Sequence, residues 1–105
     1  MSDALDRLFA TIAARKGADP ASSYTAKLLA EGVEKCAKKF GEEATETVIA
    51  AISRDKTELA KESADVLYHL LVLWAASGIT PEDVYAVLRS REAMSGLEEK
   101  ASRKR

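Results

Sequence analysis

Two pairs of acidic residues occur at the same spacing in this sequence. Glu43 and Glu46 lie three residues apart in "EATE", and Glu62 and Asp65 lie three residues apart in "ESAD". Residues three apart share one face of a helix, so each pair should present two carboxylates together. Close carboxylates raise one another's pKa, whereas a hard divalent cation such as Mg²⁺ prefers several oxygen ligands and shares its remaining positions with substrate phosphates. We therefore predict a Mg²⁺ site formed by these four residues.

The same acids could instead form ordinary ion pairs on an exposed helix face. Lysines precede acids by four residues in the pairs Lys38/Glu42, Lys39/Glu43 and Lys61/Asp65. That order, with the lysine first, is the less favourable one on a helix. Two acidic pairs at matching height favour the metal site over this alternative.

A helical hairpin would bring the two acidic pairs level. An apolar stripe predicts one helix over about 33–53: Val33, Cys36, Ala37, Phe40, Ala44, Val48 and Ala51. Asp55 and Glu58 are spaced as a capping box and predict a second helix over about 56–77. The connection is short, so the two helices should pack antiparallel, and the acidic pairs are about equally far from the turn at 54–55.

Three further helices complete an all-α domain over residues 1–105. Leu5, Leu8, Phe9 and Ile12 predict a helix over about 3–15. "YTAKLLAE" predicts a short helix, capped by Ser22 or Ser23 and ended by Gly32 in the left-handed C-cap conformation. Thr80 and Pro81 predict the start of the fifth helix, which should end near Gly96. Residues 96–105 form a basic tail, free to fray until something binds it.

The run from Val66 to Ala76 is apolar on nearly every side of its helix. Such a helix is normally buried all round, and four other helices could hardly cover it while burying their own stripes. We therefore predict a homodimer in which the helical hairpin completes a helix bundle across the interface. The alternative is a monomer with an exposed apolar patch, which monomers rarely tolerate.

Composition excludes several other classes of protein. Lys and Arg number 16 against 17 Asp and Glu, so no overall charge favours nucleic acid or an anionic membrane as partner. No signal peptide or membrane-spanning run is visible, and we expect a cytoplasmic protein. The single Cys36 cannot form an internal disulfide and should be a small apolar filler. His69, Tyr68 and Trp74 lie in the apolar run and should be packing residues.

The sequence also resembles a known family. "KKFGEEATETVIAA" and "ELAKESADVLYHLLVLWAASGI" resemble the phosphoribosyl-ATP pyrophosphohydrolases, and "SYTAKLL" and "SGLEEKASR" extend the match over nearly the whole chain. "EATE" and "ESAD" also fit the wider signature of the all-α nucleoside triphosphate pyrophosphohydrolases. Trp74 departs from the family pattern, where an aliphatic residue is expected, without affecting the chemistry.

The resemblance implies an activity and a place in metabolism. Members hydrolyse phosphoribosyl-ATP to phosphoribosyl-AMP and pyrophosphate with Mg²⁺, as α-helical dimers, in the second step of histidine biosynthesis. This chain lacks room for the cyclohydrolase domain fused to some relatives, so the stand-alone form is implied. The four predicted ligands would hold one or more Mg²⁺ ions, and Glu42 or Glu46 would orient or deprotonate the attacking water.

The substrate of that family carries a second phosphate group, on its phosphoribosyl end. Basic residues near the acidic pairs or in the matched C-terminal segment are the candidates for binding phosphate: Lys27, Lys35, Lys38, Lys39, Arg91, Lys100 and Arg103. We expect Lys38 or Lys39 to bind the polyphosphate. The tail residues could bind the ribosyl phosphate or form a solvated tail, and deletion of 97–105 should raise KM if they bind it.

Two alternatives remain at this point. A house-cleaning pyrophosphohydrolase acting on dCTP, dUTP or damaged nucleotides would share the fold and the metal site. A dimeric helical interaction module without enzymatic activity would carry the carboxylates as surface charge.

Overall fold

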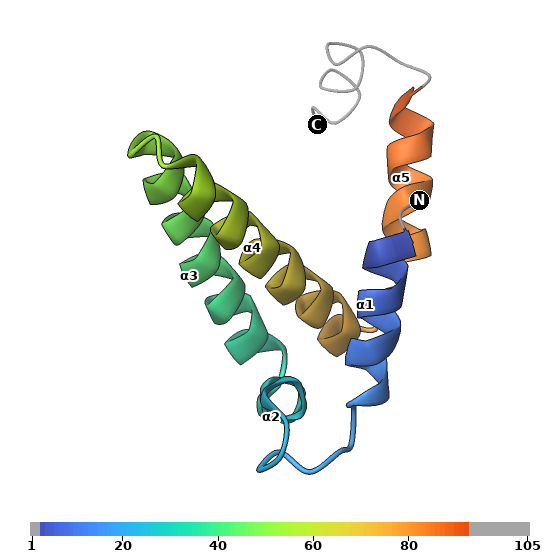
Figure 1. The fold of residues 1–105 in the computed structure, drawn as a ribbon. Coiled ribbons are helices and arrows are strands. Elements are labelled where there is room, and N and C mark those ends of the chain that lie inside the picture. Colours follow the sequence, from blue (N-terminus) through green and yellow to red (C-terminus); the bar gives the residue numbers. More distant parts are fainter. Residues whose placement is uncertain (1–2, 93–105) are drawn as a thin grey trace.

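The structure, a computed structural model, describes residues 3–92, which form five α-helices and no strand (Figure 1). The helices are α1 (Asp3–Ala14), α2 (Tyr24–Glu31), α3 (Val33–Ile52), α4 (Lys56–Ser77) and α5 (Pro81–Glu92). The predicted all-α fold is confirmed, and α1 and α3 each end one residue earlier than expected. The basic tail at 96–105 and the predicted helix end near Gly96 lie outside the described residues.

The hairpin of α3 and α4 is the longest packed unit, and its two helices run antiparallel side by side (Figure 1). Its turn is closed by Arg54, whose φ of 62° lies in the left-handed region. Asp55 then caps α4, because its side chain accepts a hydrogen bond from the Glu58 backbone N–H at 3.0 Å. The turn and the cap together place residues 43–46 of α3 beside residues 62–65 of α4.

Local signals also set the ends of α2 and α5. Ser23 caps α2 by accepting from the Ala26 N–H at 3.1 Å. Thr80 and Asp83 cap α5 reciprocally, each side chain accepting from the backbone N–H of the other. Gly32 separates α2 from α3 with φ 97° and ψ 176°. The positive φ requires glycine, but the ψ corrects the expected left-handed cap: the chain is extended here and turns sharply into α3.

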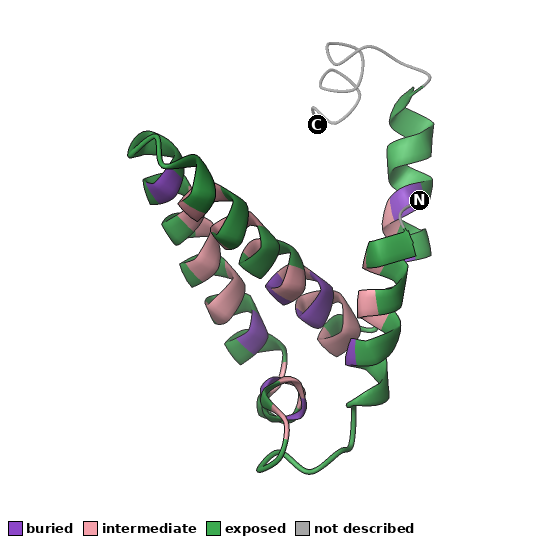
Figure 2. Ribbon diagram, in the orientation of Figure 1, coloured by how far each residue is buried: buried purple, intermediate pink, exposed green. Residues whose placement is uncertain are grey.

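The core lies where α1 and α2 close on the hairpin, near the C-terminal end of α4 (Figure 2). Its five most deeply buried side chains are Ile12, Leu28, Cys36, Leu71 and Val72. Cys36 is the small buried residue that the sequence predicted, and its Sγ donates to the Leu28 carbonyl at 3.3 Å. Tyr85 of α5 donates to Asp6 of α1 at 3.0 Å, which ties the last helix to the first.

The face that α3 turns toward α4 differs from its predicted apolar stripe. Cys36 and Ala50 are buried and Phe40, Glu43 and Thr47 are half-buried, at the spacing of one helix face. Residues of the predicted stripe are exposed instead, including Val33 and Val48, which are 46% and 56% exposed. The physical reason is that apolar side chains cover more than one sector of α3, and one chain buries only the sector carrying Glu43.

The apolar run of α4 is partly covered within the single chain. His69, Leu71 and Val72 are buried, whereas Leu67 is 42% exposed. Apolar side chains of α1 supply much of this cover, and they include Leu5, Leu8, Phe9 and Ile12.

Among residues 3–92 no single helix has both the length and the apolar composition to cross a membrane; α4 and α5 satisfy that test only when taken together, and they are bent by 110° at their junction.

Candidate metal centre

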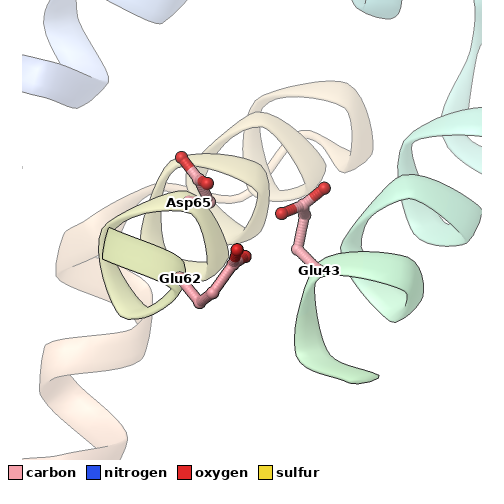
Figure 3. Close-up of side chains that lie close together, drawn as sticks. All are labelled: Glu43, Glu62 and Asp65. Atoms are coloured by element: carbon pink, nitrogen blue, oxygen red, sulfur yellow. The ribbon is translucent and has the colours of Figure 1, made fainter. Parts of the chain in front are cut away.

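Three of the four predicted ligands come together in the hairpin. Glu43 on α3 and Glu62 and Asp65 on α4 each offer a carboxylate oxygen, and these oxygens lie within 4.8 Å of one another. Figure 3 shows Glu43 extending from its helix toward the two acids of α4. Glu43 and Glu62 are half-buried, and Asp65 is exposed at the edge. This is the set of hard oxygen donors that a divalent cation takes, with an open side for water or substrate.

Glu62 is the most perturbed acid of the described chain. Its Oε1 is buried without a hydrogen-bond partner among residues 3–92. Loss of contact with water, together with the neighbouring Glu58, Glu46, Glu43 and Asp65 carboxyls, raises its pKa to about 7. A buried oxygen without a donor is costly for a protein, and a cation at this position would compensate it.

Thr47 fixes the two helices beside the cluster, a role that sequence analysis did not predict. Its half-buried Oγ1 lies 2.9 Å from the Glu43 carbonyl and 3.3 Å from the Glu62 carbonyl. The single hydroxyl proton donates to one of these carbonyls at a time. The available signal was its position, because Thr47 follows Glu43 by four residues and so shares its helix face.

Glu46 and Glu42 lie outside the cluster of three carboxylates. Glu46 is exposed, but its charge is close enough to raise the pKa of Glu62, and the two line one cleft near the turn. Glu42 is exposed and forms an ion pair with Lys39 at 3.2 Å. From the sequence, we considered pairs four residues apart, Lys38 with Glu42 and Lys39 with Glu43. In the structure Glu42 instead pairs with Lys39, three residues away.

Three of the predicted basic residues line one pocket beside the cluster. Lys27 comes from α2, and Lys35 and Lys39 come from α3; the other lining residues are Tyr24, Leu28 and Glu31. Lys38 is exposed and does not line this pocket. Arg91 lies at the end of α5, and Lys100 and Arg103 lie outside the described residues.

His69 links the carboxylate cluster to α2. It is 7% exposed, and its Nδ1 donates to the Asp65 carbonyl at 3.0 Å. A carbonyl only accepts, so Nδ1 carries the proton and Nε2 is left to accept from the Tyr24 hydroxyl at 3.5 Å. His69 is therefore the hydrogen-bonded packing residue predicted from the sequence, and its ring meets those of Tyr24 and Tyr68 edge-on.

Comparison with known proteins identifies the family. The family model described as phosphoribosyl-ATP pyrophosphohydrolase matches residues 5–92. A phosphoribosyl-ATP pyrophosphatase of Parvibaculum lavamentivorans is 68% identical over 94% of this chain and 91% of its own length. Proteins of the same name from Cereibacter sphaeroides and Azospirillum brasilense are 63% and 59% identical, over 94% and 95% of this chain and 96% and 90% of theirs. The resemblance seen in the sequence is confirmed, and the chain belongs to the phosphoribosyl-ATP pyrophosphohydrolase family.

Proposed function

We propose that this chain hydrolyses phosphoribosyl-ATP to phosphoribosyl-AMP and pyrophosphate with Mg²⁺, the second step of histidine biosynthesis. The observation that carries this proposal is the cluster of Glu43, Glu62 and Asp65, in a chain of this family. A cluster with a buried oxygen that lacks a donor is poorly suited to surface charge and well suited to a cation.

The donor set fits Mg²⁺ in its chemistry. The cluster supplies three carboxylates, and Glu46, which lines one cleft with Glu62, would join them through water. A divalent cation bound here would neutralise charge on the polyphosphate and favour attack at phosphorus.

The chain's own residues would bind the substrate and accept the proton of the attacking water. Lys39, half-buried and paired with Glu42 beside the cluster, would contact the polyphosphate. Water attacks the α-phosphorus, a new O–P bond forms, and the anhydride bond to the β-phosphate breaks with pyrophosphate as the leaving group. The proton of that water passes to a carboxylate, for which Glu46 is the better-placed candidate because Glu42 is held by Lys39.

A homodimer is the second part of the proposal. Several apolar residues remain exposed on the single chain, among them Val48, Ile49 and Ile52 of α3, Leu67 of α4, and Val87 and Leu88 of α5. Burial of each such side chain contributes about 1.5–3 kcal/mol, so a second copy covering part of this surface would be stabilising. We further propose that the chain is a single domain, built around the one core described, and acts in the cytoplasm.

The test is pyrophosphate release from phosphoribosyl-ATP, with and without Mg²⁺, beside ATP, dCTP and dUTP. Release from phosphoribosyl-ATP alone, only with metal, is the expected result. Release mainly from a plain nucleotide would indicate a house-cleaning pyrophosphohydrolase instead. Release from none of these substrates would favour the interaction module.

Replacing a cluster carboxylate separates enzyme from module directly. Glu43→Gln should lower activity about 100-fold or more, since stabilisation by a metal amounts to several kcal/mol. The free energy of unfolding without metal should stay constant or rise, because one carboxylate repulsion is removed. Activity and chemical denaturation of the same preparation measure both effects, and unchanged activity would contradict the metal assignment.

A further inference from the structure

We propose that the pocket lined by Tyr24, Lys27, Leu28, Glu31, Lys35 and Lys39 binds the phosphate of a ribose 5-phosphate group. We call it the lysine pocket. It would thereby select a nucleotide that carries a phosphoribosyl group over a plain nucleoside triphosphate. This inference rests on the proposed function and adds the element that determines specificity.

The charges of the lysine pocket suit a phosphate monoester. Its lining contains three lysines and one acid, Glu31. Within residues 3–92 neither Lys27 nor Lys35 forms an ion pair or a side-chain hydrogen bond. Their ammonium groups are therefore available for an anion, whereas Lys39 is engaged by Glu42 on the side of the metal cluster.

Tyr24 gives the pocket a fixed aromatic wall. Its ring stacks on Tyr68 with centroids 6.5 Å apart and an interplanar angle of 22°. Its hydroxyl meets His69 Nε2, and Thr25, the next residue, hydrogen-bonds the Tyr68 hydroxyl. Tyr24 is nevertheless 51% exposed, so part of its surface is free to pack against a sugar.

The position of the lysine pocket matches a substrate with two anionic ends. Lys39 lines the pocket and precedes Glu43 of the cluster by four residues, about one turn of α3, so the pocket borders the carboxylate cluster. Tyr24 is joined to Asp65 of the cluster through His69. One substrate can therefore place its polyphosphate at the cluster and its other phosphate among the lysines of α2 and α3.

The lysine pocket is smaller than a pocket that encloses a whole nucleotide. Its volume is about 200 Å³, below the roughly 300–1,000 Å³ typical of pockets that enclose a drug-sized ligand. A phosphorylated sugar end fits this volume better, with the rest of the nucleotide lying outside. From the sequence, the C-terminal tail was one hypothesis for binding this phosphate, beside the alternative of a solvated tail, and the lysine pocket is the competing site.

The first experiment measures binding without catalysis. Ribose 5-phosphate is titrated into the full-length protein and followed by NMR chemical shifts, in the wild type and in Lys27→Ala/Lys35→Ala. The matched control is Lys16→Ala/Lys56→Ala, which removes two exposed lysines that do not line the pocket. We expect binding to weaken about 10- to 100-fold in the pocket variant only, the range for loss of charge-assisted hydrogen bonds. Equal binding in both variants would overturn the proposal.

Glu31→Gln should strengthen binding, an effect that damage to the fold would not produce. It removes the acidic side chain of the pocket, so ribose 5-phosphate should bind about two- to three-fold more tightly. Unchanged or weaker binding would overturn the proposal.

Kinetics then separate this inference from the proposed function. Lys27→Ala/Lys35→Ala should raise KM for phosphoribosyl-ATP about 10- to 100-fold with kcat within about twofold, and Mg²⁺ affinity by calorimetry should be unchanged. A rise in KM on deletion of 97–105, with none in the lysine variant, would overturn the pocket and favour the tail. A wild type inactive on phosphoribosyl-ATP would refute the proposed function, while the NMR titration would still decide whether the pocket binds a phosphosugar.

Discussion

The two ends of the α3–α4 hairpin differ sharply in how they are covered. At the near end, against α1 and α2, Cys36, Leu71 and Val72 are each 1% exposed. At the far end, beside the turn, Ile49 and Ile52 are 59% and 75% exposed although they are equally apolar (Figure 2). The near end is therefore folded by the chain itself, whereas the far end presents a surface suited to association. The carboxylate cluster lies between the two.

This position explains how a repulsive cluster is tolerated. The near end supplies the buried apolar area that holds the hairpin together, and Thr47 joins the two helices beside Glu43 and Glu62. Close carboxylates are thus held together, against their mutual repulsion, by packing elsewhere in the hairpin.

The largest effect should come from breaking the near end. Leu71→Ala should lower the free energy of unfolding by about 2–5 kcal/mol, because a fully buried side chain leaves a cavity. Urea denaturation at low protein concentration, where association is negligible, is the measurement. Ile52→Ala is the matched control and should cost less than about 1 kcal/mol there. Equal losses would show that the two ends do not differ as described.

Substitutions at the far end should affect association of the chains more than folding. Ile52→Asp should weaken dimerisation about tenfold or more, because one apolar side chain contributes about 1.5–3 kcal/mol when buried. Sedimentation equilibrium of the variant and the wild type measures this. Thr57→Asp adds the same charge at an exposed polar position nearby and should have little effect. An unchanged dimer dissociation constant for Ile52→Asp would place the interface elsewhere.

The pH dependence of folding stability should distinguish the carboxylate cluster from both ends of the hairpin, because Glu62 takes up a proton on folding. Its pKa rises from 4.5 unfolded to about 7 folded, so the folded state binds more protons between those pH values. Stability without metal should therefore fall as pH rises from about 4.5 to 7 and change no further above that.

The same shift predicts that Mg²⁺ displaces a proton. Affinity for Mg²⁺ should rise about tenfold from pH 6 to pH 8, with proton release detected by calorimetry in two buffers at pH 6.5. Glu62→Gln should abolish the release. Mg²⁺ binding without proton release in the wild type would argue against Glu62 as a ligand.

The smallest effect concerns the turn at the far end. Asp55→Ala should cost about 1 kcal/mol of folding free energy through loss of the α4 cap. Asp55→Asn should retain nearly all the stability, because asparagine caps equally well. Thermal denaturation compares the two, and an equal loss in both would mean that the charge of Asp55 matters more than its hydrogen bond.

Much of this fold could be predicted because its helices begin and end at local signals. Ser23, Asp55 and Thr80 act through residues three positions away, so the sequence alone locates the starts of α2, α4 and α5. The spacing of the acidic pairs from the turn likewise predicted that Glu43 would come level with Glu62 and Asp65.

The rest depends on contacts that no local pattern specifies. Apolar side chains surround much of α3, so their count could not show which sector faces α4. Glu42 forms its ion pair with Lys39 rather than with Lys38, and this depends on side-chain conformation. The lysine pocket depends on the direction of α2, which follows from the unusual backbone of Gly32.

The position of the carboxylate cluster in the sequence also bears on the order of events in folding. All three of its carboxylates come from residues 43–65, across a single turn. Contacts between residues close in sequence form faster than those between distant ones, because less chain entropy is lost in closing the loop. The hairpin can therefore assemble its acidic site before α1 and α5 meet, and docking of the chain's two ends becomes the later event in folding.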